Sequence, residues 1–136
     1  MDEKRRKELL ALYADMLTMD SAPMRRVAVW ELGRLADPGG AEHVMRAIAG
    51  DPDWECRHYA IMALANVGRP EDAVELRRLI EDGYLSQEGR DEAGPPPEGL
   101  VEHMLEDLDY AMKCSKGEVP RPSEDDGKHG EWWRGG

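Results

Sequence analysis

The sequence lacks the features that most metal sites, disulfide frameworks and membrane spans require. It has no Phe and only two Cys among 136 residues. Cys56 and Cys114 stand far apart and match no ligand spacing such as Cys-x-x-Cys, so we predict neither zinc nor a disulfide, and a reducing cytoplasm is the expected location. No stretch reaches the roughly 18 apolar residues of a membrane span. The charged start of the chain leads into an amphipathic pattern, so no secretion signal is expected.

Catalytic signatures are missing as well. The sequence has no Gly-x-Ser-x-Gly elbow, no phosphate-cradling glycine loop and no His-Glu-x-x-His pair. Asp125, Asp126 and His129 are close in sequence, but a flexible tail cannot hold them in a fixed geometry. We therefore predict that the chain is not an enzyme, with no catalytic residues and no cofactor.

The sequence has only four histidines, and their spacing indicates no clear metal site. His103 and Asp107, four residues apart on a predicted helix, could supply two ligands of a metal ion. No third ligand is indicated by the sequence, so we expect an ordinary surface pair and no metal. His43 and His58 have no evident partner.

Basic residues are outnumbered, and the imbalance is uneven. The chain has 29 acidic and 18 basic side chains, a net charge of −11. Residues 1–80 hold 14 acidic and 12 basic side chains, a net of −2, whereas residues 81–126 hold 14 acidic and 4 basic, a net of −10. Such a surplus repels a nucleic-acid backbone and an anionic membrane, so neither is expected as a partner. It suits another protein with a basic surface.

A repeat of 32 residues runs through the first part of the chain. Shifting the sequence by 32 places residues 24–35 on residues 56–67 without a gap, and Pro38 on Pro70. The same shift backwards puts residues 9–16 in register with residues 41–48. The chain therefore carries two full units preceded by half of another.

Each unit is predicted to form two helices. Apolar residues recur at helical spacing in the first helix of each unit, at Met24, Ala28, Leu32 and Leu35 and again at Cys56, Ala60, Leu64 and Val67. Ser21 and Asp53, also 32 residues apart, are predicted N-caps. The second helices are expected at about 40–49 and 71–82, after Pro38 and Pro70. A lone helix is expected at about 3–19, with four side chains pointing inward: Leu9, Leu12, Tyr13 and Met16.

The repeat stops after residue 82, and the rest of the chain has a different character. Residues 83–97 form a polar and Pro-rich linker, and residues 98–116 contain an acidic capping helix. Val101, Leu105, Leu108 and Met112 share the predicted inner face of that helix, while its outer face carries five acidic residues: Glu98, Glu102, Glu106, Asp107 and Asp109. Residues 117–136 lack a core-forming pattern and are expected to be a flexible tail.

The repeated residues resemble the HEAT-like repeats of the phycobilisome-lyase type. The second unit has Asp51-Pro52 followed by Cys56-Arg57-His58-Tyr59-Ala60, and the first has Leu32-Gly33 and Asp37-Pro38. Glu31 departs from the pattern, which has Ala there. The resemblance implies an all-α fold, a short right-handed α-solenoid of about two and a half helical hairpins in residues 1–82. It also implies that Arg25 and Arg57 bond within or between units.

The resemblance places the second helices on the concave side of the solenoid. It implies a partner-binding stripe across that side, made of Tyr13, Met45, Arg46, Arg77 and Arg78. Two tryptophans in a tail without a core pattern add a candidate docking motif, Trp132, Trp133 and Arg134.

These surfaces favour a protein-interaction module, an adaptor or accessory subunit of a larger bacterial-type assembly, with self-association possible. The alternative is a chromophore-lyase-like or cofactor-maturation factor. A basic DNA-binding groove is disfavoured by the net charge.

Overall fold

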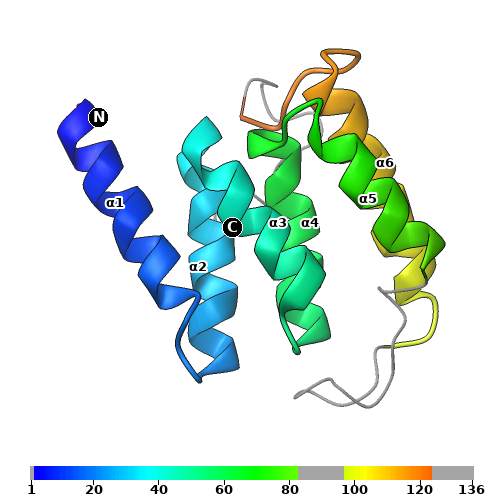
Figure 1. Ribbon diagram of the computed structural model, residues 1–136, viewed down its shortest axis with the longest axis horizontal. Coiled ribbons are helices and arrows are strands. Elements are labelled where there is room, and N and C mark those ends of the chain that lie inside the picture. The colour runs from blue at the N-terminus through cyan, green and yellow to red at the C-terminus, as the bar shows by residue number, and fades with distance from the viewer. Residues whose placement is uncertain (1, 83–96, 124–136) are drawn as a thin grey trace.

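The computed structural model describes residues 2–82 and 97–123 and is all-helical over these residues, with no strand among them (Figure 1). The described part contains six α-helices and one 3₁₀ turn, in this order: α1 (Glu3–Met16), α2 (Ala22–Leu35), η1 (Pro38–Gly40), α3 (Ala41–Gly50), α4 (Trp54–Val67), α5 (Asp72–Glu81) and α6 (Leu100–Ser115). None of these helices combines the length and the apolar character needed to cross a membrane.

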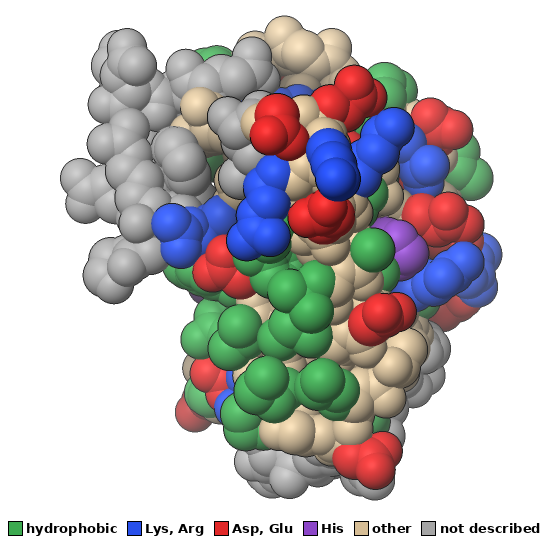
Figure 2. Space-filling view, turned by 90° about the vertical axis from the view of Figure 1, so that its left-hand side faces the viewer, with side chains coloured by type: hydrophobic (Ala, Val, Ile, Leu, Met, Phe, Trp, Pro, Cys, Tyr) green, Lys and Arg blue, Asp and Glu red, His purple; other side chains and the backbone are tan. Residues whose placement is uncertain are grey.

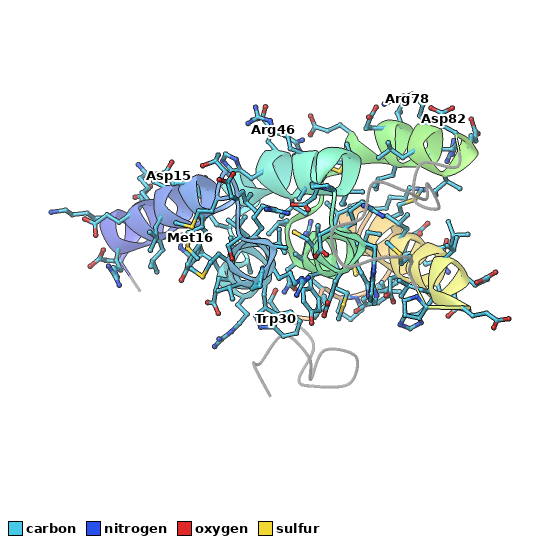
Figure 3. The ribbon with its side chains drawn as sticks, turned by 90° about the horizontal axis from the view of Figure 1, so that it is seen from below. Asp15, Met16, Trp30, Arg46, Arg78 and Asp82 are labelled. Carbon is cyan, nitrogen blue, oxygen red and sulfur yellow. The ribbon has the colours of Figure 1, made fainter. Side chains whose placement is uncertain are left out.

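The helices form two layers, one above the other in Figure 3, where the molecule is seen from below. One layer contains α1, α3 and α5, and the other contains α2, α4 and α6. Within the second layer α4 packs between α2 and α6, and α3 covers it from the first layer. This arrangement confirms the predicted short solenoid of helical hairpins closed by a last helix.

Local signals explain where the helices of the repeat begin. The Oγ atom of Ser21 accepts a hydrogen bond from the backbone N–H of Met24, and the carboxylate of Asp53 accepts one from the N–H of Cys56 at 2.9 Å. Both N-caps are therefore confirmed. Pro38 lies in the opening turn η1, and α3 and α5 begin and end within one residue of the predicted bounds.

The hydrophobic core is centred on α4. The predicted stripe of Cys56, Ala60, Leu64 and Val67 is buried, with exposed fractions of at most 2%. Small residues bring α2 close to α4, because a Cβ added at Gly33 would lie 2.9 Å from the Cβ of Ala63. The contact therefore has no room for a side chain at position 33.

Buried charges connect the first unit to the start of the second. Arg25 on α2 donates from Nε to Oδ2 of Asp51 at 2.9 Å, and Arg26 donates from Nε to Oδ2 of Asp53 at 2.7 Å. Arg57 on α4 donates from Nη1 to the backbone oxygen of Asp51 at 2.9 Å. These bonds join the turn before α4 to both first helices, as the resemblance implied for Arg25 and Arg57.

The inner face of α1 differs from the prediction. Leu12 was expected to point inward but is 51% exposed, whereas Leu10 is half-buried and packs onto the core. The reason is that α1 contacts mainly α2 and η1, so only one narrow face of the helix is covered. A Cβ added at Gly39 of η1 would meet a methyl group of Leu10 at 2.9 Å, which shows how closely this side is packed.

The inner face of α6 is rotated from the predicted one. Its buried residues are Met104, Leu108, Ala111 and Cys114. The other predicted core residues of this helix lie half-buried at the edge of that stripe, because α6 packs against α5 as well as α4. The rotation also brings Asp107, predicted to face outward, toward α4.

Residues 117–123 belong to the folded part and correct the expected start of the flexible tail. Arg121 donates from Nη2 to the backbone oxygen of Gly68 at 2.7 Å, and the N–H of Ser123 donates to Oδ1 of Asn66 at 2.8 Å. Asn66 is buried, and its Nδ2 donates a hydrogen bond to the backbone oxygen of Gly33 at 2.9 Å. A segment without an apolar pattern is thus held by polar groups at the end of α4.

Candidate interaction surfaces

The predicted arginine stripe lies on the layer of α1, α3 and α5. Arg46 on α3 and Arg78 on α5 point away from the other layer in Figure 3, and both are exposed, as is Arg77. Glu42 lies 3.3 Å from Arg46, while Glu75 and Asp82 both bind Arg78. The hydrogen bond and the charge of Glu75 raise the pKa of Arg78. Much of the positive charge of the stripe is therefore balanced within each helix.

Tyr13 and Met45, expected in the same stripe, lie elsewhere. Tyr13 is half-buried and packs on the core, and its pKa is raised by burial and by the charge of Glu31 on α2. Met45 is only 9% exposed, because α3 buries a face wide enough to include it along with Val44 and Ile48. The exposed stripe thus consists of arginines alone.

A hollow of about 520 Å³ lies between the end of α1 and α3. It is lined by residues of α1, of α3 and of the turns that follow them, and its polar wall includes the buried pair Arg25 and Asp51. His43 and Arg46 also line it. The wall of the hollow thus has a polar part and an apolar part, and Leu17, Ala47 and Pro52 contribute to the apolar part.

The open end of the solenoid, beside α1 and the start of α2, exposes apolar side chains. Four large hydrophobic residues with exposed fractions of 40–51% come from this region: Leu12, Met19, Met24 and Val27. Figure 2 looks onto this side and shows hydrophobic side chains gathered below a charged upper part. We call these four residues the open-end patch.

The repeat register explains why the patch is uncovered. Val27 corresponds to Tyr59, which packs its ring edge-on against Trp30 of α2 at a centroid distance of 5.5 Å. Met24 corresponds to Cys56, which is completely buried. Helices α2 and α4 are the first helices of the two repeat units. Helix α4 packs beside α2, but among the described residues no first helix of an earlier unit packs beside α2 in the same way. The position of Met24 is therefore buried in the second unit and that of Val27 is partly buried there, whereas both are exposed in the first.

A cluster of two histidines and an aspartate joins α4 to α6. Nε2 of His58 lies 3.0 Å from Oδ2 of Asp107, and Nε2 of His103 lies 3.6 Å from the same oxygen. The two imidazole rings meet edge to face, with centroids 5.4 Å apart. The expectation that His58 has no partner was wrong, since the contact spans 49 residues and no sequence spacing signals it.

The remaining predicted site residues, Trp132, Trp133 and Arg134, lie outside the described residues, so the docking motif stays a prediction.

Comparison with known proteins supports the repeat. A family model for HEAT repeats matches residues 9–89, which is more than half of the chain. No curated protein and no solved structure matches the chain significantly. The matched segment begins within α1 and includes all of α2–α5, the helices that the 32-residue register relates to one another. The chain therefore belongs to the HEAT-repeat family.

Proposed function

We propose that the chain is a non-catalytic protein-interaction module, an adaptor or accessory subunit of a larger assembly. HEAT repeats commonly mediate interactions between proteins, and the chain belongs to that family. Stacked repeats bury their faces only against their neighbours and need polar ends to stay soluble. The uncovered open-end patch is the observation that carries the proposal.

The patch has the form of a docking site for one helix. In the second unit the equivalent positions are covered by α2, through the contact of Tyr59 with Trp30. A partner helix lying beside α2 would cover Met24 and Val27 in the same way, and an amphipathic helix supplies the apolar stripe for it. The opposite end of the solenoid differs, because α6 closes it and exposes Glu102, Glu106 and Asp109.

Replacing Val27 by Asp tests the docking site. Val27 is 48% exposed, so a charge there leaves the fold intact but opposes an apolar partner. We expect V27D to lose a partner that the wild-type chain retains in affinity capture from a lysate of the source organism, with the partner identified by mass spectrometry. V74D is the matched control, because Val74 is a 78% exposed apolar residue on α5, away from the patch.

The outcomes separate the possible surfaces. A partner kept by V74D and lost by V27D supports docking at the open end. A partner kept by V27D but lost when Arg46, Arg77 and Arg78 are replaced by Ala would move the site to the arginine stripe. Loss only when residues 124–136 are removed would assign binding to the segment with Trp132 and Trp133. Sedimentation of the purified wild type and V27D shows whether the helix comes from a second copy.

The alternative is a chromophore-lyase-like or cofactor-maturation factor of the phycobilisome-lyase type. It is favoured by the hollow between α1 and α3, whose volume of about 520 Å³ lies within the range of small-molecule sites. Purified protein would then carry or take up a pigment or cofactor, and R46A would weaken that uptake. Protein that stays colourless and binds no such molecule would count against this function.

A further inference from the structure

We propose that His58, His103 and Asp107 form a binding site for a divalent transition-metal ion such as Zn²⁺, which clips α6 to α4. The three side chains each offer one ligand atom, and these atoms lie within 4.8 Å of one another. His58 comes from α4, whereas His103 and Asp107 come from successive turns of α6.

The two ligand-atom distances to Asp107 suit one small ion. With metal–ligand bonds near 2.0–2.1 Å, two ligands of a tetrahedral ion lie roughly 3.3 Å apart. The two distances to Oδ2 of Asp107, 3.0 Å from His58 and 3.6 Å from His103, fall on either side of that value. Small rotations of the side chains would thus admit an ion between them.

The chemistry of the ligand set selects the type of ion. Two imidazole nitrogens and one carboxylate oxygen suit Zn²⁺, Co²⁺, Ni²⁺ or Cu²⁺, whereas Mg²⁺ and Ca²⁺ prefer oxygen ligands alone. Three protein ligands leave a fourth position for water.

Access and preorganisation also favour binding. The side chain of His58 is 15% exposed and that of Asp107 is 29% exposed, so both are held in place by their surroundings. The side chain of His103 is 60% exposed and leaves the site open to solvent. The direct contact of His58 with Asp107 already brings two of the three ligands together across the helix interface.

Binding would have a mechanical effect on the solenoid. Asp107 lies 49 residues after His58 along the chain, and the ion would cross-link the last helix to the central one. Because an ion that binds only the folded chain stabilises it, Zn²⁺ should raise the melting temperature.

Titration of the metal-stripped full chain with ZnCl₂ in a calorimeter tests the proposal. We expect one ion per chain, and at least about tenfold weaker binding in H58Q and in H103A. H58Q retains a side chain able to hydrogen-bond Asp107, and His103 is largely exposed, so both variants should fold. H43A and H129A are matched controls that remove the other two histidines of the chain and should bind as the wild type does.

Melting curves with and without Zn²⁺ give a second readout. The ion should raise the melting temperature of the wild type and of H129A, but not that of H103A. Equal affinity in the wild type and H58Q, loss of binding in H129A, or no binding at all would each overturn the proposal. The site lies on α4 and α6, so its failure leaves docking at the open end untouched.

Discussion

At the scale of single residues, the carboxylate of Asp53 both caps a helix and forms an ion pair. Its carboxylate is completely buried, caps α4 through the N–H of Cys56, and accepts two hydrogen bonds from Arg26 at 2.7 and 3.0 Å. Burial disfavours the ionised carboxylate, but the bonds from Arg26 and Cys56 outweigh it and lower the pKa of Asp53. The repeat places Ser21 at the equivalent position, where the cap is an exposed hydroxyl and not a buried, charged carboxylate.

Replacing Asp53 by Ala should lower the free energy of unfolding by about 2–4 kcal/mol at neutral pH, because it removes a cap and leaves Arg26 without its buried partner. S21A, which removes only an exposed cap, should cost about 0.5–1 kcal/mol. Urea denaturation followed by circular dichroism measures both. Equal losses in the two variants would contradict the role of the ion pair.

The effect of D53A should depend on pH in a defined direction. The pKa of Asp53 is lower in the folded chain than its ordinary value of 3.8, so the carboxylate stabilises the fold at pH values above 3.8. That contribution is lost as the pH falls through the lower folded value, because both states are then protonated. The difference in unfolding free energy between wild type and D53A should therefore shrink in acid. A difference that stays constant between pH 7 and pH 3 would contradict this.

At the scale of helices, the distance between α2 and α4 is set by Gly33. An added Cβ would lie 2.9 Å from the Cβ and 3.0 Å from the Cα of Ala63, and backbone atoms cannot yield locally. The backbone oxygen of Gly33 also accepts the bond from Asn66, so a shift of α2 would disturb that buried contact.

G33A should therefore destabilise the chain by about 1–3 kcal/mol, as overpacked interfaces do. Gly50 is a matched control, since it is the last residue of α3 and an added Cβ there meets nothing within 4 Å. G50A should be neutral or slightly stabilising, because Ala favours helices. Thermal melting of the two variants compares them, and a G33A variant as stable as G50A would show that the helices can separate without cost.

At the scale of the whole molecule, the segment after α6 closes the solenoid over the ends of the central helices. Pro122 is buried, and the bonds from Arg121 and Ser123 reach Gly68 and Asn66. Residues 117–123 thus fasten α6 to the same end of α4 that carries the contact with Gly33.

A chain ending at Lys116 should be less stable than one ending at Ser123 by about 1–3 kcal/mol. The shorter chain loses the partner of Oδ1 of Asn66, and a buried polar atom without its partner is costly. Comparing the two truncations isolates residues 117–123, and chemical denaturation measures the difference. Identical stabilities would mean that water replaces these bonds.

The sequence alone determined the helices, their caps and the repeat, because these depend on residues close together along the chain. Ser21 and Asp53 cap helices whichever way those helices pack, and the 32-residue register follows from the order of the residues alone. The burial of Cys56, Ala60 and Leu64 was equally predictable, since α4 is central and covered on several sides.

Only the tertiary structure decided which face each outer helix buries. Apolar spacing shows which residues share a face, but α1 and α6 have few neighbours, and their orientation depends on those neighbours. For this reason Leu10, and not Leu12, packs against the core, and Asp107 turns toward α4. The meeting of His58 with Asp107 arises in the same way, because it requires two helices distant in sequence to lie side by side at one rotation.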